Sequence, residues 1–229
     1  MFRNLISATL GACLLATAAG PARAPVLVEL FTSEGCSRCP PADQVLAALD
    51  SQAIVLGEHV DYWDHDGWRD RFSSHANTLR QEAYARHFGN QGPYTPQMVV
   101  DGAIEFNGAD GHRALEEVTH ARDREKAAVR LSRSGSGVDI NVDNPPHSAD
   151  VLLALAQDGA ETQVEGGENR GRHLRHVAIL RSMRKVGSVK KGGAFHQTVE
   201  LKADSSAGRV IVILQDSDMG RVYGAAVLQ

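Results

Sequence analysis

The stretch VLVELFTSEGCSRCPPAD, residues 26–43, carries the strongest structural signals in the chain. Residues 26–31 form a short apolar run rich in strand-favouring side chains, which predicts a β-strand. Residues 42–49 place apolar side chains at helical spacing, and prolines are tolerated in the first turn of a helix. Because the residue before a proline avoids helical conformation, we expect this helix to begin around Pro40. A Cys-x-x-Cys pair therefore lies between a strand and a helix.

Further strands and helices alternate along the chain up to residue 127. The expected elements are a strand at 54–60, a helix at 72–88 ended by Gly89, a hairpin of 97–101 with 104–107, and a helix at 110–124. This order is typical of an α/β domain. Past residue 127 the expected elements are short strands between turns, at 128–131, 138–142, 151–156, 177–180, 197–201, 210–214 and 222–228. Such a series predicts an all-β, sandwich-like C-terminal domain.

Composition narrows the class of protein. The chain has 229 residues, 42% of them hydrophobic and 23% charged, and a net charge of −4. These values are ordinary for globular proteins and argue against a disordered or fibrous chain. Three cysteines are too few to build a disulfide scaffold. The mild acidity argues against binding nucleic acid through overall charge.

Residues 1–24 have the pattern of a secretory signal peptide. Arg3 precedes an apolar stretch, and the segment ends in the small-x-small pattern of residues 22–24. Residues 10–13 also resemble a lipoprotein attachment box, the less favoured alternative. Cleavage after residue 24 removes two of 24 cations and none of 28 acids, so the charge becomes 22 − 28 = −6. It also removes Cys13, and we expect an exported protein, periplasmic or secreted, with two cysteines.

Cys36 and Cys39 are the candidate chemical groups of the mature chain. A thiol attacks a disulfide only as its thiolate, so a catalytic pair needs an environment that lowers a thiol pKa. Free N–H groups at a helix start favour negative charge, and Arg38 adds a nearby cation. The same spacing forms half of many zinc sites, but the sequence holds no second Cys-x-x-Cys. We therefore favour a redox-active pair over a metal site.

These residues resemble the active-site strand and helix of the thioredoxin superfamily. A second mark is YTPQMVVDG, residues 94–102, which is similar to the cis-proline loop that faces the active-site pair. The resemblance implies that Cys36 is the exposed, attacking thiol and that Cys39 resolves the mixed disulfide. It also implies that Thr95 and Pro96 pair with an extended substrate segment.

Further expectations concern four more residues, of which the thioredoxin resemblance supplies the first. Glu29 occupies the strand position of a buried acid thought to assist proton transfer from the second cysteine. Arg38, Tyr94 and Trp63 are the expected substrate contacts. Trp63 belongs to DYWDHDGW, residues 61–68, which we interpret chiefly as a packed loop. The alternatives for this loop are a wall of the substrate groove, or a metal site in which histidines join the cysteines.

The chain also resembles a secreted bacterial family, domain of unknown function 1223. The shared phrases span both halves of the mature chain: ELFTSEGCSRCPPAD, VDYWDHDGW, YTPQMVVDG and GENRGRHLRHV. This resemblance implies a thioredoxin-like domain at 25–127 followed by a β domain at 128–229. It implies no established activity.

The sequence therefore predicts an α/β thioredoxin-like domain followed by an all-β, sandwich-like C-terminal domain. The expected function is thiol–disulfide exchange on a cysteine-containing exported protein, with no cofactor, no metal, no nucleic acid and no stable membrane insertion. One alternative is a non-catalytic binding module, such as a copper or zinc carrier that uses both thiolates and a histidine. Another is an adaptor in which Cys36 and Cys39 form a stable internal disulfide.

Overall fold

The structure, a computed structural model, describes residues 25–65, 67–201 and 208–228. The predicted signal peptide at 1–24 lies outside the described residues. Within the described ranges, no helix is long and apolar enough to cross a membrane.

The first half of the described chain alternates strands and helices, as the sequence predicts. Its elements are β1 (Leu27–Thr32), α1 (Pro40–Leu49), β2 (Ile54–His59), α2 (His75–Phe88), β3 (Gln97–Val100), β4 (Ile104–Asn107) and α3 (Gly111–Ala121). Helix α1 begins at Pro40, with Cys39 at its N-cap position. Helix α2 starts three residues later than predicted, after Ser74, and ends at Gly89, whose φ of 73° closes it in the left-handed region.

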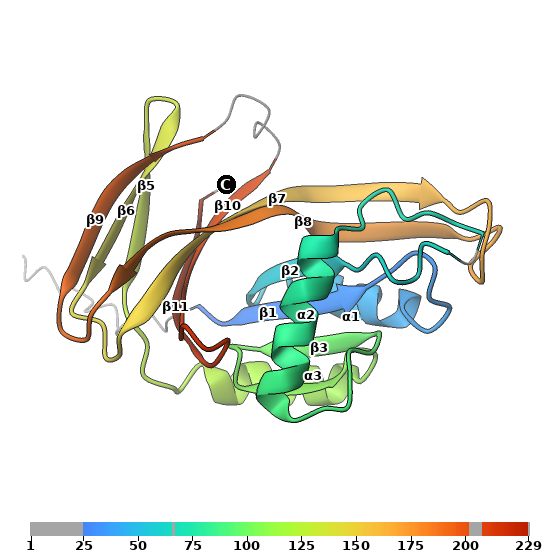
Figure 1. Cartoon of the computed structure of the whole chain (residues 1–229), viewed down its shortest axis with the longest axis horizontal. Helices are drawn as coiled ribbons and strands as arrows, with labels where there is room; N and C mark the ends of the chain where they lie inside the picture. The colour runs from blue at the N-terminus through green and yellow to red at the C-terminus, as the bar shows by residue number, and fades with distance from the viewer. Residues whose placement is uncertain (1–24, 66, 202–207, 229) are drawn as a thin grey trace, which may run out of the picture.

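The helices cover both faces of the strands. β1 pairs with β2 in parallel and with β3 in antiparallel, and β3 forms the predicted hairpin with β4. Because side chains alternate along a strand, Val28 and Leu30 pack with α1 and α3 on one face. Phe31 packs with Tyr84 of α2 on the other face (Figure 1).

The turn of the β3–β4 hairpin explains why residue 102 is a glycine. Asp101 and Gly102 have φ angles of 49° and 60°, the two positive values that a tight hairpin turn requires. A Cβ atom at Gly102 would lie 2.3 Å from the backbone oxygen of Gly220, so the C-terminal half packs directly on this turn.

The second half of the described chain consists of strands. These are β5 (Val129–Ser134), β6 (Gly137–Asp143), β7 (Ala149–Gln163), β8 (His173–Val189), β9 (Ala194–Glu200), β10 (Arg209–Gln215) and β11 (Val222–Leu228). Strands β5, β6 and β9 form a three-stranded sheet, and the other four join the strands of the first half. The result is one eight-stranded mixed sheet in the order β11-β10-β7-β8-β2-β1-β3-β4.

The predicted fold class is therefore wrong. The sequence predicted an α/β thioredoxin-like domain followed by a separate sandwich-like domain, whereas one large sheet contains strands from both halves. β8 pairs in parallel with β2 at Gly57 and Ile179, so the edge of β2 is covered by the C-terminal half. The predicted domain boundary after residue 127 falls between α3 and β5 and stays a prediction.

The large hairpin of β7 and β8 accounts for the difference. Its strands have 15 and 17 residues, whereas the sequence predicted short strands at 151–156 and 177–180. Only parts of these strands are apolar, since polar and charged side chains continue them toward the hairpin tip. Figure 1 shows the hairpin extending across the sheet beyond the ends of β1 and β2.

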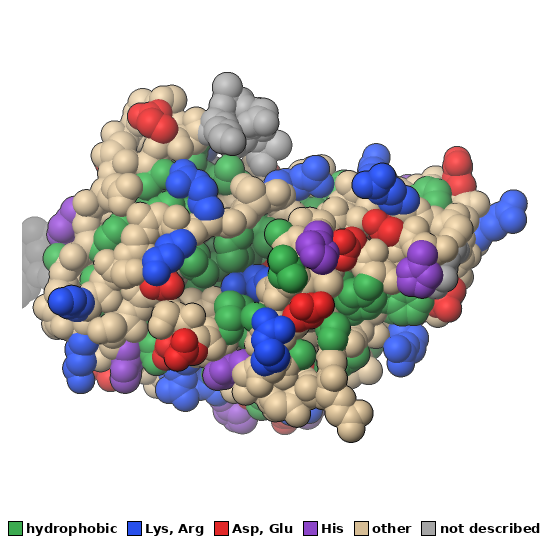
Figure 2. Space-filling view, in the orientation of Figure 1, with side chains coloured by type: hydrophobic (Ala, Val, Ile, Leu, Met, Phe, Trp, Pro, Cys, Tyr) green, Lys and Arg blue, Asp and Glu red, His purple; other side chains and the backbone are tan. Residues whose placement is uncertain are grey.

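Apolar packing joins the two halves. One buried cluster combines Leu27 and Leu56 of the first half with Leu180, Ile211 and Ile213 of the second. Another buried cluster fills the space between the three-stranded sheet and strands β7 and β10. On the face shown in Figure 2, basic and acidic side chains are interspersed around exposed apolar ones.

Candidate functional site

The two cysteines lie on the loop between β1 and α1. The Cys36 backbone N–H donates to the Ser33 carbonyl at 3.2 Å, and the Cys39 N–H donates to the Cys36 carbonyl at 3.1 Å. The Cys39 carbonyl accepts the first helical hydrogen bonds, from Ala42 at 2.9 Å and Asp43 at 3.1 Å. This backbone arrangement holds both cysteines at the start of α1, as the strand–Cys-x-x-Cys–helix pattern predicts.

The two thiols have opposite pKa shifts. Hydrogen bonding to the Cys39 side chain lowers the pKa of Cys36 to about 6, against the opposing effect of burial, and Thr95 and Arg38 lower it further. Burial raises the pKa of Cys39 far above its usual range, and the neighbouring Cys36 and Asp43 raise it further. At neutral pH these shifts favour a thiolate at Cys36, and the protonated Cys39 thiol donates a hydrogen bond to it.

Both cysteines are buried. Cys36 exposes 1% of its surface and Cys39 none, so the expectation that Cys36 is exposed is wrong. The tip of the β7–β8 hairpin covers the loop that carries them. There the Asn169 amide donates to the Glu34 and Cys36 carbonyls at 2.8 and 2.9 Å. The Glu168 carboxylate accepts the Ser37 backbone N–H at 3.0 Å.

Three of the predicted site residues meet beside Cys36. Arg38 donates to the Thr95 carbonyl at 3.3 Å, and the Trp63 indole donates to the Thr95 hydroxyl at 2.8 Å. The Thr95–Pro96 peptide bond is cis. A Cβ atom at Gly35 would lie 3.0 Å from the Trp63 Cβ, so Trp63 packs closely on the cysteine loop.

Tyr94 is directed away from the cysteines. Its hydroxyl donates to Glu105 of β4, and its carbonyl accepts the Gln81 amide at 2.6 Å. These bonds link Tyr94 to α2 and β4, and among the described residues no hydrogen bond joins it to either cysteine.

Glu29 is also held elsewhere. It is fully buried on the face of the sheet that packs against α2, and Arg80 donates to its carboxylate at 2.6 Å. The Tyr84 hydroxyl donates to the second carboxylate oxygen at 2.6 Å. Side chains alternate along β1, so Glu29 lies on the same face as Phe31, against α2, and not on the face that packs with α1. Its hydrogen bonds therefore join it to α2 and not to the cysteines.

A buried cluster of acids and histidines lies beside the cysteine loop, and the sequence did not predict it. Its members are Glu34, Asp43, His59, Asp70 and His176. The His59 and Asp70 side chains are 2.6 Å apart, and His176 lies 3.3 Å from Glu34 and 3.8 Å from Asp43. The two histidine rings meet edge to face, with centroids 4.6 Å apart. His59 and His176 are separated by more than one hundred residues in sequence, so no local pattern links them.

The acids of this cluster differ in pKa. Burial raises the pKa of Asp43 to about 7, although His176 acts in the opposite direction. Burial also opposes ionisation of Glu34, but hydrogen bonds that include His176 lower its pKa overall. The pKa of Asp70 is lowered because His59 and backbone N–H groups outweigh its burial. Asp43 is thus the acid of the cluster that changes charge near neutral pH.

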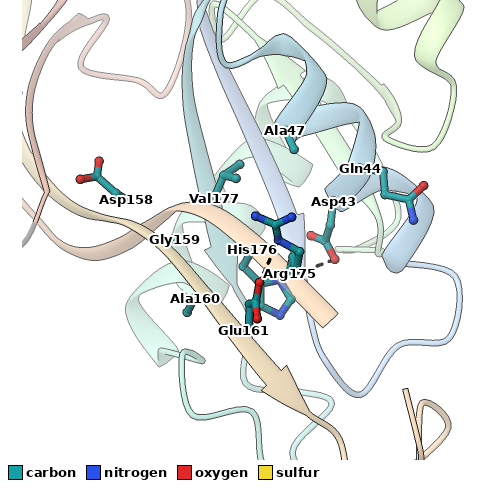
Figure 3. Close-up of a pocket in the computed structure, with 10 residues that line it drawn as sticks. All are labelled: Asp43, Gln44, Ala47, Asp158, Gly159, Ala160, Glu161, Arg175, His176 and Val177. Atoms are coloured by element: carbon teal, nitrogen blue, oxygen red, sulfur yellow. Dashed lines mark ion pairs between the residues drawn. The ribbon is translucent and has the colours of Figure 1, made fainter. Parts of the chain in front are cut away.

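A pocket of about 690 Å³ opens beside this cluster. Figure 3 shows it between α1 and the β7–β8 hairpin, with Asp43 and His176 at its inner wall. Arg175 and Glu161 also line it and pair at 3.1 Å. Among the described residues, no three His, Cys, Asp or Glu side chains are arranged to hold a metal ion.

Comparisons with known proteins give relatives in sequence and in structure. The chain is 27% identical to an Agrobacterium tumefaciens protein of known crystal structure, with a TM-score of 0.81 over 91% of this chain and 96% of that one. HBP35 of Porphyromonas gingivalis is 13% identical, with a TM-score of 0.59 over 91% of this chain and 76% of that one, and this likeness concerns the fold alone. No curated protein matches significantly. Residues 27–215 match the family described as "Protein of unknown function (DUF1223)". Since this match spans most of its length, the chain belongs to the DUF1223 family.

Proposed function

We propose that the protein carries out thiol–disulfide exchange through Cys36 and Cys39. The observation that carries the proposal is the opposite pKa shift of two thiols held on one helix start, to about 6 for Cys36 and upward for Cys39. A low pKa makes Cys36 a thiolate at neutral pH, which is the form that attacks a disulfide.

The reaction proceeds in two exchanges. The Cys36 thiolate attacks one sulfur of a substrate disulfide, forms a mixed disulfide and displaces the second substrate sulfur as a thiolate, which takes up a proton. Cys39 then loses its proton and attacks Cys36, so that the bond to the substrate breaks and a Cys36–Cys39 disulfide forms. The substrate disulfide gains two electrons from the cysteine pair and two protons, one released by Cys39 and one taken from solvent, because Cys36 reacts as a thiolate that has already lost its proton.

Residues beside Cys36 support a substrate site. Arg38 and Trp63 both donate hydrogen bonds to Thr95, and Thr95 itself lowers the Cys36 pKa. We propose that this group contacts the segment that carries the substrate sulfur. The cover formed by Glu168 and Asn169 must move aside for a protein substrate, because Cys36 exposes only 1% of its surface.

We also propose that the protein acts after export, on a cysteine-containing exported protein. The signal-peptide pattern of residues 1–24 supports this location. Amino-terminal sequencing of the protein recovered from the periplasm or the medium tests it, and an intact Met1 on the recovered protein would count against it.

A redox titration tests the function. The purified protein is equilibrated in buffers of defined thiol–disulfide ratio, and its free cysteines are counted by alkylation. We expect one reversible two-electron transition, which the Cys36→Ser variant cannot show. A pair that is never reduced would favour an adaptor with a stable disulfide. A stoichiometric metal that survives dialysis of the reduced protein would favour a carrier.

Trapping of mixed disulfides tests the order of attack. The Cys39→Ser variant cannot resolve a mixed disulfide, so we expect it to accumulate adducts with exported proteins through Cys36. The Cys36→Ser variant is the matched control and should accumulate none. Equal trapping by the two variants would contradict the assigned roles.

A further inference from the structure

Cys39 has to lose a proton in a place without solvent. The residue exposes none of its surface, and burial raises its pKa. A buried thiol at neutral pH attacks slowly unless a neighbouring base accepts its proton as it attacks. Resolution therefore requires a buried group near Cys39 that can act as this base.

Asp43 is the acidic residue in the first turn of α1, one helical turn after Cys39. It follows Cys39 by four residues, and its backbone N–H donates to the Cys39 carbonyl at 3.1 Å. Residues four apart lie on the same face of a helix, and side chains tilt toward the helix N-terminus. Asp43 is 8% exposed, and its negative charge raises the pKa of Cys39. Glu29, the acid expected from the sequence, is held by Arg80 on the opposite face of the sheet.

His176 of β8 connects Asp43 to a second acid. Its Nδ1 lies 3.8 Å from an Asp43 oxygen and its Nε2 lies 3.3 Å from a Glu34 oxygen. An imidazole can take up a proton at one nitrogen and release it at the other. Other charged or titratable groups lie near Asp43 or His176. They are Cys36 and Cys39 of the loop, His59 of β2, Asp70 of the segment before α2, and Asp158, Glu161 and Arg175 of the pocket lining.

The pocket beside α1 gives this pair a route to solvent. Asp43 and His176 line its inner wall, while Glu161 and Arg175 lie among its other lining residues (Figure 3). The cysteines do not line it. A proton released from Cys39 can therefore reach solvent through a pocket that the cysteines themselves do not line.

We propose that Asp43 accepts the Cys39 proton during resolution, and that His176 and the pocket pass it to solvent. This role rests on the proposed thiol–disulfide exchange. The electron pair of Cys39 forms the bond to Cys36, the bond from Cys36 to the substrate sulfur breaks, and that sulfur leaves with its electron pair. The proton moves from Cys39 to Asp43 and then to pocket water, where the leaving thiolate can recover it. Asp43 belongs to α1 in the first half of the chain and His176 to β8 in the second, so the C-terminal half takes part in the proposed chemistry.

The two exchanges can be measured separately with dithionitrobenzoate. The reduced protein releases one thionitrobenzoate when Cys36 attacks and a second when Cys39 resolves the mixed disulfide. We expect the second rate to rise with pH and to level off above about pH 7, where Asp43 is ionised. In Asp43→Asn we expect this rate to fall about 100-fold at pH 7 and to keep rising with pH, since only ionisation of Cys39 itself then limits it.

His176→Gln and Gln44→Ala complete the test. His176 lowers the Asp43 pKa, so its removal should move the inflection of the second rate to higher pH. Gln44 lines the same pocket and should leave both rates unchanged. The first rate controls for folding of each variant. If Asp43→Asn does not fold, the wild-type inflection and its shift in His176→Gln still decide the matter.

Two results would count against the proposal in different ways. A second rate with the same pH profile in wild type and Asp43→Asn, or a wild-type profile without an inflection near pH 7, would overturn the role of Asp43 alone. Release of a single thionitrobenzoate by the wild type would mean that the pair does not close, and would overturn the proposed function as well.

Discussion

Cys36 and Cys39 are three residues apart, yet the pKa of the Cys36 thiol is lowered and that of the Cys39 thiol is raised. The largest cause for Cys36 is the hydrogen bond from Cys39, which stabilises its thiolate. We therefore expect alkylation of Cys36 to show a midpoint near pH 6 in the wild type. Cys39→Ala removes the donor and should raise that midpoint by about one to two pH units. The rate of reaction with iodoacetamide as a function of pH measures both values.

Cys39→Ser is the matched control for this first prediction. Serine keeps a donor at the same position, so the midpoint of Cys36 alkylation should stay closer to the wild-type value than it does in Cys39→Ala. Identical midpoints in the wild type and Cys39→Ala would mean that Cys39 does not stabilise the Cys36 thiolate.

Asp43 should make the stability of the protein fall with rising pH. Its pKa is about 7 in the folded chain, against about 3.9 for an unfolded aspartate. Between these values the folded state holds a proton that the unfolded state has lost. The free energy of unfolding therefore falls as pH rises through this window, by up to about 4 kcal/mol in total.

Asp43→Asn cannot show this loss. Urea unfolding is measured under reducing conditions. The free energy of unfolding of the variant should rise relative to that of the wild type as the pH increases from about 4 to about 8. Glu116→Gln removes an exposed carboxylate of α3 and serves as the control, with little change relative to wild type. Parallel stability curves for wild type and Asp43→Asn would contradict the raised pKa of Asp43.

At the residue scale, sequence reasoning found the groups that lie close together in the chain. The Cys-x-x-Cys pair and Arg38 are adjacent residues, and the resemblance to thioredoxin supplied Thr95. It missed Asp43 and His176, because a buried charge leaves no periodic signal and His176 reaches the site only through the long β8. It placed Glu29 in the site because strand position does not reveal which face of the sheet a side chain occupies.

The tip of the β7–β8 hairpin acts as a cover over the cysteine loop. The Asn169 side chain is fully buried and bonds two carbonyls of that loop, at Glu34 and Cys36. In Asn169→Ala both carbonyls lose a partner, which costs about 1–3 kcal/mol per buried group. The cover should then open more often, and Cys36 should be alkylated at least about thirtyfold faster at pH 8, the factor that corresponds to about 2 kcal/mol.

Arg170→Ala is the control for the cover, because Arg170 is exposed beside Asn169. The measurement is made above the Cys36 midpoint, so that a change in rate reports access to the thiol and not its ionisation. Equal rates in Asn169→Ala and the wild type would show that the hairpin tip does not limit access.

Helix α2 explains why some elements are easier to predict than to place. Its ends follow from local signals, the Ser74 cap and Gly89. The face it buries is polar, and it docks through hydrogen bonds such as Asn77 to the His59 carbonyl at 2.9 Å and Arg80 to Glu29 at 2.6 Å. Such a face has no apolar stripe, so the sequence predicted the helix and gave no sign of its position.

At the scale of the whole molecule, the first half could be predicted and its junction with the second could not. Strands β1, β3 and β4 and helix α1 follow from short apolar runs and turn residues near each other in sequence. The pairing of β2 with β8 joins Gly57 to Ile179, and strand pairing at that separation has no local signature. The apolar runs of β7 and β8 also ended well before the strands did.

The shared sheet predicts that the two halves fold together. The edge of β2 is covered by β8, Leu27 and Leu56 pack against Ile211 and Ile213, and the Val222 backbone N–H donates to the Asp101 carbonyl at 2.7 Å. Residues 25–127 alone would expose this strand edge and apolar surface to water. We expect that fragment to lack cooperative unfolding and native near-ultraviolet circular dichroism.

The intact chain should unfold in one transition, whether followed by tryptophan fluorescence or by far-ultraviolet circular dichroism. Trp63 and Trp68 both lie in the first half, whereas most strands lie in the second, so the two signals report different halves. Coincident transitions are the mark of a single cooperative unit. Mixing residues 25–127 with residues 128–229 should restore the native spectrum if the shared sheet reassembles. A fragment of residues 25–127 that unfolds cooperatively by itself would show instead that the halves are independent domains, and that β8 adds its histidine to a site already folded without it.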